Sequence, residues 1–352
     1  MKTSTAIFSA ILAAALYALN APASKLLLQN VPPSMMAALL YLGAGLGMLL
    51  MGLARRAAGR PSAEAHLTRM DLPYTIGMIV LDILAPIFLM IGISHTTAAN
   101  ASLLNNFEIV ATSLIALFIF KEKISRRLWL AIGLIVLSSA LLTVEDAGSL
   151  RFSVGSVFVL LASCCWGLEN NCTRMLSQSD PQEIVIVKGL GSGAGALLVA
   201  LLTGESFPAW GYVPFALLLG FVAYGLSIYF YVMAQKDLGA AKTSAYYSIA
   251  PFLGVAFGML ILGERPAIQF YAALIVMIVS TYFMIKDTIE LQHTHEHSHT
   301  HTHEHRHGDT VHSHEHTHVH THIHVHGEDS GDHEHNHNAM PHEHLHPVGQ
   351  GC

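Results

Sequence analysis

Apolar residues occur in long runs along the first 286 positions of the chain, and short polar segments separate these runs. A run of ~20 apolar residues is long enough to cross a ~30 Å hydrocarbon layer as a helix, whereas an isolated strand would leave its backbone groups unpaired there. The pattern therefore predicts an all-α integral membrane fold with ten transmembrane helices. We expect them at about 4–25, 33–53, 73–95, 98–120, 127–145, 153–176, 181–203, 209–235, 238–262 and 266–286.

Composition supports this fold class, because 52% of the residues are hydrophobic and 12% are charged, against about 25% charged in soluble domains. The longest interior loop is 54–72, so no room remains for a soluble catalytic domain, and we do not expect an enzyme. The first run resembles a cleaved signal peptide. It continues past Pro22 to Leu28, however, and a related segment recurs in mid-chain, so we interpret it as a span.

Basic residues near span ends predict the orientation, because they favour the cytoplasmic side. The loops on the other side contain three basic residues, Lys25, Arg151 and Arg265. The loops on the side of the termini contain twelve: Lys2, Arg55, Arg56, Arg60, Arg69, Lys121, Lys123, Arg126, Arg127, Arg174, Lys236 and Lys286. We therefore expect a multi-pass protein of the plasma (inner) membrane with both termini in the cytoplasm.

The chain contains an internal repeat. YALNAPASKLLLQNVP at 17–32 aligns with WGLENNCTRMLSQSDP at 166–181, GAGLG at 43–47 with GSGAG at 191–195, and AANASLLNNFEIVATSLIALFIFKE at 98–122 with AAKTSAYYSIAPFLGVAFGMLILGE at 240–264. The offsets are 149, 148 and 142, in the same order along both halves. Each half holds five spans, and because five is odd, the second copy enters the membrane from the opposite side. The predicted units are a five-helix repeat at 1–145, a second at 146–286, and a disordered cytoplasmic tail at 287–352.

Inverted repeats are typical of transporters, because two similar halves of opposite orientation can exchange conformations and open a midplane site to either side. A duplicated helix bundle with no transport role is the alternative. The glycine runs within the repeat superficially suggest a phosphate loop, but that motif needs a strand before it and a helix after it in water. In a membrane span, small residues let helix backbones approach closely, so we expect these glycines to serve packing.

The repeat carries a family resemblance. Both halves have an acidic turn at the end of a span, Lys121-Glu122 and Gly263-Glu264-Arg265, and the chain is similar to the EamA-type branch of the drug/metabolite transporter superfamily. Glu108-Ile109 lies where that family often has Glu-Pro, whereas the second half keeps Pro251 and has Ala250 in place of the acid. The resemblance covers about residues 5–286. It implies the ten-helix architecture and a small-solute substrate, since members move amino acids, nucleotide-type metabolites, drugs and other solutes.

Ionisable side chains within the predicted spans are candidates for function, because each costs at least ~2.5–3.5 kcal/mol near the bilayer centre. Asp82 and Glu108 lie near mid-depth and could carry a proton across the membrane, or could only lock helices together. Glu169 and Lys188 lie nearer the cytoplasm, where a long side chain can reach water, so Lys188 is the weakest candidate.

Polar and aromatic residues recur at repeat-related positions around these charges, as in a small-molecule site. The candidate substrate-binding residues are Tyr17, Asn20, Asp82, Asn105, Glu108, Trp166, Glu169, Tyr246 and Tyr247. Tyrosine and tryptophan also lie at membrane interfaces, which is the alternative explanation for each aromatic residue. We expect a central cavity between the halves. Cys165, Glu169 and Cys172 share one helix face that could hold a soft metal, but buried free cysteine is more often simple packing.

The tail after position 291 is rich in histidine in His-x-His spacing, which suits Zn, Ni or Co. The candidate metal ligands are His293, His295, His297, His299, His301, His303, His305, His307, His312, His314, His316, His318, His320, His322, His324 and His326. The tail could instead sense pH, store metal without affecting transport, or be low-complexity sequence without a role. We expect that no cofactor is required for transport.

These patterns predict a secondary transporter that moves a small organic metabolite or drug-like solute by alternating access, and we expect it to be an exporter. Proton coupling and a metal-binding tail are further expectations. One alternative is a divalent transition-metal exporter, and another is a membrane metal sensor or buffer without flux. The expected partners are the lipid bilayer, a small-molecule substrate and transition-metal ions, with no nucleic acid. The oligomeric state, direction and coupling ion stay open.

Overall fold

A computed structural model describes residues 3–59, 65–121, 124–146, 151–176, 179–238, 243, 246–307 and 310–325. The chain divides into a helical unit, 1–290, and a tail unit, 291–352, which are described separately below. The helical unit confirms the predicted all-α fold. Its described helices are α1 (Thr3–Ala18), α2 (Asn20–Leu27), α3 (Pro33–Ala57), α4 (Leu72–His95), α5 (Ala98–Leu104), α6 (Phe107–Phe120), α7 (Arg126–Thr143), α8 (Val154–Met175), α9 (Pro181–Leu202), α10 (Val213–Gly220), α11 (Ser227–Leu238), α13 (Ala250–Leu262) and α14 (Ile268–Leu291).

The helices include most of the predicted spans, and several of these consist of two pieces. Within the described residues, eight segments are long and apolar enough to cross a membrane, and α13 is a shorter apolar helix. α1 with α2, α5 with α6, and α10 with α11 each make one span, the last through the π-helix η2 (Phe221–Leu226). The 3-10 helix η1 (Arg69–Asp71) precedes α4, and the short strands β1 (Val144–Asp146) and β2 (Arg151–Phe152), which the sequence did not predict, pair antiparallel after α7.

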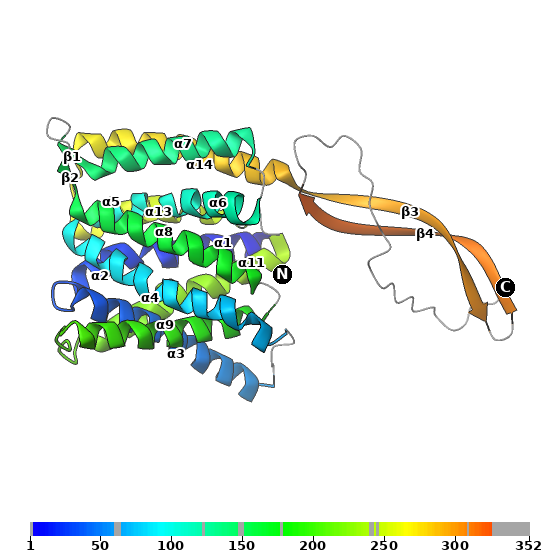
Figure 1. Ribbon diagram of the computed structural model, residues 1–352, viewed down its shortest axis with the longest axis horizontal. Coiled ribbons are helices and arrows are strands. Elements are labelled where there is room, and N and C mark those ends of the chain that lie inside the picture. Colours follow the sequence, from blue (N-terminus) through cyan, green and yellow to red (C-terminus); the bar gives the residue numbers. More distant parts are fainter. Residues whose placement is uncertain are drawn as a thin grey trace. The chain divides into compact units, whose positions relative to one another are not determined.

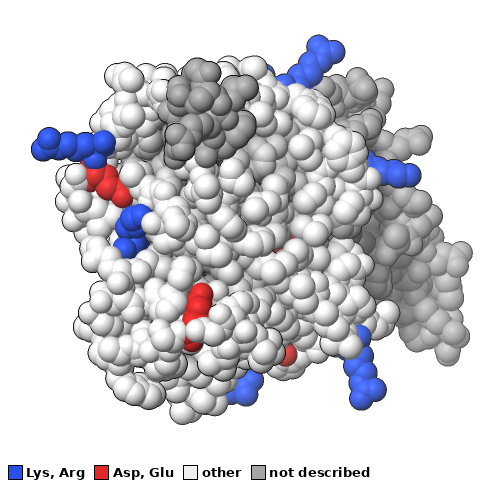
Figure 2. Space-filling model, turned by 60° about the vertical axis from the view of Figure 1, so that its left-hand side comes forward, with Lys and Arg blue, Asp and Glu red and all other residues white. Residues whose placement is uncertain are grey.

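The outer surface of the helical unit suits contact with lipid. Figure 2 shows a face that is largely uncharged, with a few lysine, arginine and acidic side chains scattered on it. Large apolar side chains are exposed around the unit, among them Phe8, Leu50, Phe118, Leu260 and Ile268. In water this much exposed apolar surface would be unfavourable, whereas lipid tails accept it.

The two halves interlock helix by helix. α3 packs against α9, α4 against α8, α1 against α11, and α5 against α13, and in Figure 1 α7 and α14 lie side by side along one edge of the unit. Every one of these pairs joins a helix before residue 146 to one after residue 153. The halves therefore form one packed unit and do not separate into two bodies.

Glycines of the two runs make the closest contact between the halves. A Cβ added to Gly45 would lie 2.7 Å from the backbone nitrogen of Leu190, and one added to Gly193 would lie 2.7 Å from that of Leu42. Positions 45 and 193 are 148 residues apart, as are 42 and 190, which is the repeat offset at this point. Higher numbers on α3 meet lower numbers on α9, so the two equivalent helices are antiparallel. This geometry is that of inverted repeats, and it supports the packing role of the glycines.

The acidic turn of the second half has a structural role. The Glu264 carboxylate accepts hydrogen bonds from the backbone nitrogens of Ala98 at 2.7 Å and Ala99 at 2.9 Å, and so caps the first turn of α5. Gly263 ends α13 in the left-handed region with φ 64°, and its repeat equivalent, Lys121, ends α6 with φ 55°. Glu122, the equivalent of Glu264, lies outside the described residues.

The tail unit contains a two-stranded antiparallel ribbon of β3 (Gln292–His307) and β4 (Thr310–Val325). Its register pairs histidine with histidine along the ribbon, from His293 with His324 to His305 with His312. An isolated two-stranded ribbon is marginally stable at best in water, and this segment has few large apolar residues. The pairing is thus consistent with a tail that has no stable fold of its own. His326 lies outside the described residues.

Candidate functional site

Irregular helices bring polar groups into the middle of the unit. The α1–α2 span breaks at Leu19, and the α5–α6 span breaks at Asn105 and Asn106. α4 contains Pro86, which has no N–H to donate to the carbonyl of Asp82, four residues earlier. The π-helix η2 interrupts the α10–α11 span, and such bulges often mark functional sites. Discontinuous helices near the midplane are where transporters form their binding sites.

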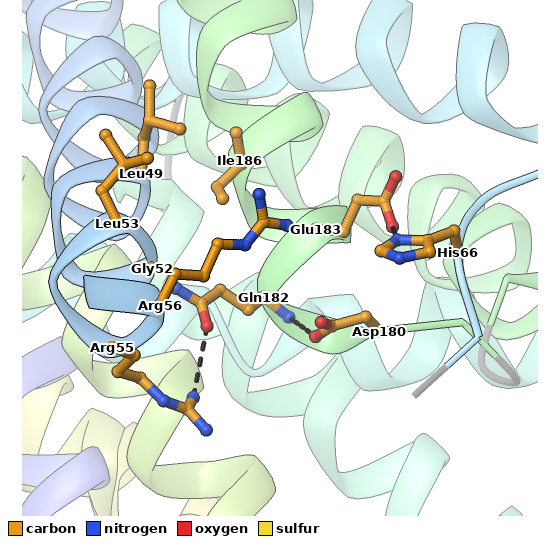
Figure 3. A pocket seen from close by; sticks show the side chains of 10 residues that line it. All are labelled: Leu49, Gly52, Leu53, Arg55, Arg56, His66, Asp180, Gln182, Glu183 and Ile186. Atoms are coloured by element: carbon orange, nitrogen blue, oxygen red, sulfur yellow. Dashed lines mark hydrogen bonds and ion pairs between the residues drawn. The ribbon is translucent and has the colours of Figure 1, made fainter. Parts of the chain in front are cut away.

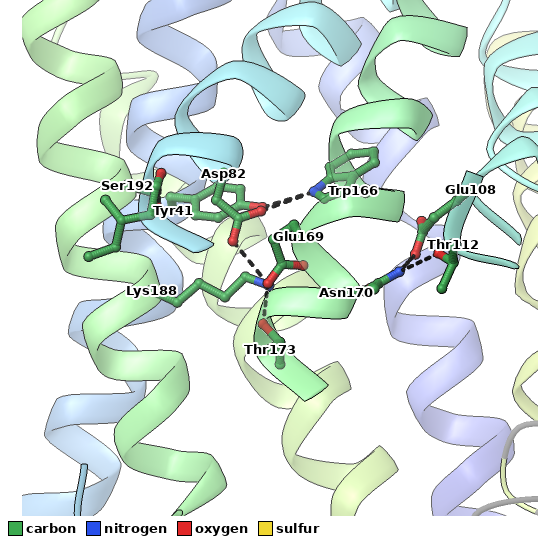
Figure 4. Close-up of polar contacts among 11 residues, drawn as sticks. Tyr41, Asp82, Glu108, Thr112, Trp166, Glu169, Asn170, Thr173, Lys188 and Ser192 are labelled. Atoms are coloured by element: carbon green, nitrogen blue, oxygen red, sulfur yellow. Dashed lines mark hydrogen bonds and ion pairs between the residues drawn. The ribbon is translucent and has the colours of Figure 1, made fainter. Parts of the chain in front are cut away.

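Asp82 is fully buried, with 0% of its side chain exposed, and the structure surrounds it with donors. Its Oδ1 accepts hydrogen bonds from the Tyr41 hydroxyl at 2.9 Å and from Trp166 Nε1 at 3.2 Å. Its Oδ2 forms an ion pair with Lys188 Nζ at 3.0 Å (Figure 4). Since α3, α8 and α9 each supply one donor, the Asp82 carboxylate ties three helices to α4.

Lys188 lies between two acids. Its Nζ is 3.0 Å from Asp82 Oδ2 and 3.0 Å from Glu169 Oε1, and the Thr173 hydroxyl donates a further hydrogen bond to Glu169. Asp82 belongs to the first half and the other two to the second. A buried charge is tolerated only where partners compensate for its lost hydration, and here one ammonium serves two carboxylates. With all three groups ionised, this cluster carries one net negative charge.

Close helix packing makes the cluster possible. A Cβ on Gly191 would lie 2.8 Å from Ile79 Cδ1, so α9 approaches α4 closely one turn from Lys188. Ser192 also donates a hydrogen bond to the Ile79 carbonyl at 3.1 Å. The same glycine run that joins the halves therefore brings the Lys188 ammonium within reach of Asp82 (Figure 4).

Glu108 lies beside the cluster, in the first turn of α6. Its Oε1 accepts a hydrogen bond at 2.6 Å from Asn170 Nδ2, which also donates to the Thr112 hydroxyl at 3.2 Å. Asn170 follows Glu169 directly on α8, and Figure 4 shows Glu169 on one side of that helix and Glu108 on the other. Gly167 permits this contact, because a Cβ there would lie 2.4 Å from that of Ala111 on α6.

A series of tyrosines adjoins the charged cluster. The Tyr41 ring lies 5.3 Å from that of Tyr224, which lies 6.0 Å from Tyr17, which in turn lies 6.1 Å from Tyr247. Asn20 donates a hydrogen bond to the Tyr224 hydroxyl at 2.9 Å. Tyr224 lies in η2, so the π-helix is what places this ring among the others. Aromatic faces next to buried acids suit a cation with an apolar body.

The predicted site residues occupy this region unequally. The structure brings Asp82, Trp166 and Glu169 together, places Tyr17, Asn20 and Tyr247 in the tyrosine series, and sets Glu108 on the far side of α8. Tyr246, by contrast, is 37% exposed. The Asn105 side-chain oxygen is buried with no hydrogen-bond partner among the described residues.

From the sequence, Lys188 is the weakest candidate, because its ammonium is expected to reach water near the cytoplasm. The structure contradicts that location. Instead of reaching towards water, its ammonium binds both acids, because α9 packs against α4 and α8. Tyr41, Tyr224 and Asn170 were also missed. A polar aromatic residue inside an apolar span was the signal for the two tyrosines. The suggested Cys165–Glu169–Cys172 metal set has no support, since no group of three such ligands occurs in the part of the chain that the structure describes.

A separate pocket of about 160 Å³ lies at the ends of α3 and α9, and it shares no residue with the charged cluster (Figure 3). Arg55 Nη1 donates to Gln182 Oε1 at 3.2 Å, and His66 Nδ1 lies 2.8 Å from Glu183 Oε2. These contacts connect the loop before α4 and the end of α3 to the start of α9. They hold one end of the interface between the halves.

The described residues contain eight helical segments long and apolar enough to cross a membrane, and they form two interlocked halves with buried charges between them. These features are those of a multi-pass membrane protein of the transporter type. The profile of the EamA-like transporter family matches residues 4–144 and again 153–286. The chain belongs to this family, which is part of the drug/metabolite transporter superfamily.

Relatives agree with this assignment, and a solved structure agrees with the fold. The chain is similar to an uncharacterized transporter of Methanothermobacter thermautotrophicus, 25% identical over 78% of this chain and 84% of that protein. It is also similar to an uncharacterized transporter of Clostridium kluyveri, 24% identical over 62% of this chain and 73% of that protein. A solved crystal structure matches with a TM-score of 0.57 over 83% of this chain and 98% of that one, at 19% identity, which supports the fold alone.

Proposed function

We propose that this protein is a secondary transporter that exports a small organic solute by alternating access, with the Asp82–Glu169–Lys188 cluster at its binding site. The observation that carries the proposal is the distribution of the cluster over the halves. Asp82 lies in the first half, and Glu169 and Lys188 lie in the second. Any movement of one half against the other changes these contacts, so a solute bound there is coupled to the conformational exchange.

The site suits an organic solute. A pocket for such a molecule combines apolar and aromatic walls with a few polar groups that fix its orientation. The tyrosine series offers aromatic surface, and the charged cluster and Glu108 offer polar groups. The pocket at the ends of α3 and α9 lies elsewhere, so a solute reaches these groups only after the packed helices around them move apart. Substitution of these groups is therefore expected to weaken solute binding more than it disturbs the fold of the outer helices.

Proton coupling is part of the proposal. A carboxylate that can bind a proton and a solute in turn links their movement, and Asp82 and Glu108 are the acids near mid-depth. Both could instead serve only as helix contacts. A proton gradient that drives solute uptake into vesicles, and a D82N variant in which it no longer does, would separate these roles.

We further propose that the tail is an accessory that binds Zn, Ni or Co at the cytoplasmic side, in a protein of the plasma membrane with both termini inside. His-x-His spacing lets several imidazole nitrogens reach one ion. The alternative functions, a transition-metal exporter and a metal sensor or buffer, are favoured by this spacing alone.

The decisive experiment is flux in proteoliposomes that contain the purified full-length protein. A panel of cationic, zwitterionic, anionic and neutral solutes is tested with and without Zn²⁺. We expect at least one organic solute to be transported. D82N should reduce its flux by about tenfold or more, which corresponds to an increase of about 1.4 kcal/mol in the activation free energy. Asp71→Asn, which changes an acid before α4 that is bonded to Thr68, is the matched control. Flux of Zn²⁺ alone would favour the exporter alternative, and no flux of any solute would favour the sensor.

A further inference from the structure

The three members of the charged cluster are held unequally. Asp82 keeps two donors besides lysine, from Tyr41 and Trp166, and Glu169 keeps one from Thr173. The ammonium of Lys188 contacts the two carboxylates. Removal of the ammonium would thus leave both acids in place, because other side chains fix them.

Lys188 is also the accessible member. Its side chain is 16% exposed, whereas those of Asp82 and Glu169 are 0% and 2% exposed. A lysine ammonium is a compact charge on a flexible four-carbon stem, so it can turn away from its partners without a backbone change. An arginine, with its planar group bonded to both acids, would leave less readily.

Charge restricts what can take the place of the ammonium. Two buried, ionised carboxylates without a cation are strongly unfavourable, so Lys188 can leave only when a proton or another cation compensates for the lost charge. An anion would add to the net negative charge of the cluster, and Glu108, which is bonded to Asn170 on the other side of α8, is a further acid. The two carboxylates each form a 3.0 Å ion pair with the present ammonium, so a primary amine, which carries the same group, satisfies them best.

We propose that Lys188 is a tethered substitute for the substrate, and that the substrate class is small primary amines in their protonated form. The substrate ammonium replaces that of Lys188 between Asp82 and Glu169, and its apolar body packs against the tyrosine series that begins at Tyr41. Lys188 then turns aside, and it returns when the substrate leaves. This inference rests on the proposed function, because it names the substrate class of that same site.

A tethered competitor has a measurable effect on affinity. Its effective concentration is high, so the wild-type protein binds an amine more weakly than a protein that lacks the lysine. Loss of Lys188 should therefore tighten amine binding. This sign is opposite to that expected for a residue that merely stabilises the site.

The test measures binding of 2-phenylethylammonium, and of phenylacetate as its anionic counterpart, by calorimetry on the purified full-length protein in lipid nanodiscs. We expect K188M to bind the ammonium about tenfold more tightly than wild type, and K188R to bind it more weakly than wild type. The double variant D82N/K188M should lose the gain. Lys25→Met is the matched control, since that ammonium contacts backbone carbonyls near the end of α4 and should leave amine affinity unchanged.

A second measurement covers the case in which K188M is too unstable to titrate. K188A is then heated with and without n-propylammonium, which can supply the missing charge, or with propionate. A rise in the melting temperature with the ammonium alone supports the proposal. Stabilisation by neither ion, or preferentially by propionate, contradicts it, as does unchanged or weaker amine binding by folded K188M.

Binding and flux separate the two proposals. Transport of a neutral or anionic solute, with amine affinity independent of Lys188, would overturn this inference and leave the transport function standing. The predicted change of affinity in K188M with no flux of any solute would instead overturn the transport function.

Discussion

Ser138 and Ser280 make the same hydrogen bond in opposite directions. Ser138 on α7 donates to the Ala273 carbonyl of α14 at 2.8 Å, and Ser280 on α14 donates to the Ala131 carbonyl of α7 at 2.8 Å. The two serines are 142 residues apart, as are the two alanines, and this is the offset of the later repeat segments. The last helix of each half is therefore bonded to its counterpart about an approximate two-fold axis.

This symmetry predicts that removal of either hydrogen bond lowers the stability of the protein by the same amount. S138A and S280A should each destabilise the folded protein by about 0.5–1.5 kcal/mol, with nearly the same value for both. Thermal unfolding in one detergent measures the difference. Ser94→Ala is the control, because the Ser94 hydroxyl is exposed and bonds within its own helix. A large effect from one serine and none from the other would contradict the symmetric role.

Gly45 should tolerate no larger residue. In G45A the new Cβ would lie 2.7 Å from the Leu190 nitrogen, so α3 and α9 must separate. We expect a loss of about 1–3 kcal/mol of stability. Gly133→Ala is a matched control on α7, where an added Cβ meets nothing within 4 Å. If G45A unfolds at the same temperature as Gly133→Ala, the close approach of the halves is not as described.

Glu264 should stabilise the protein through its cap on α5. E264Q keeps the size of the side chain but removes the charge that accepts two backbone N–H groups, and the expected loss is about 1–3 kcal/mol. The measurement is again thermal unfolding, with the exposed neighbour Arg265→Gln as control. Wild-type stability in E264Q would show that the acidic turn has another role.

The predicted topology rests on the basic residues and on the odd number of spans expected in each half. A reporter fused after Cys352 should be active in the cytoplasm, and one inserted at 146–151 should be active outside. The reversed pair of signals would overturn the orientation. Matching signals at both places would contradict the five-plus-five arrangement.

The tail should be separable from transport. A chain that ends after Leu291 retains α14 in full, so we expect unchanged folding and flux of the organic solute, but loss of most bound Zn²⁺ or Ni²⁺ as measured by equilibrium dialysis. In the full-length protein, bound metal should fall below about pH 6, because imidazole takes up a proton near its ordinary pKa of ~6.5 and releases the ion. Loss of all flux in the folded, shortened protein would instead favour the metal-exporter alternative.

The sequence alone determined the architecture. A membrane imposes a minimum span length and forbids unpaired backbone, so the apolar runs predicted helices long enough to cross it, and eight are found among the described residues. The repeat predicted opposite orientations of its copies, and the antiparallel contact of α3 with α9 agrees with that prediction. The glycine runs were also interpreted correctly as packing surfaces. These features depend on local composition and on the repeat, and both can be recognised without contacts.

Only the tertiary structure decided which polar residues meet. Lys188 is 106 positions from Asp82 in the chain. Its partners depend on the rotation of α9 about its axis and on the distance between α9 and α4. The glycines of α9 and the two neighbouring helices together determine both. Tyr224 joins the tyrosine series because a π-helix changes the direction in which its side chain points, and no residue in that segment predicts the π-helix. Helix rotation and register are collective results of packing. For this reason the sequence could name charged and aromatic candidates, but could not show that one lysine lies between two acids of different halves.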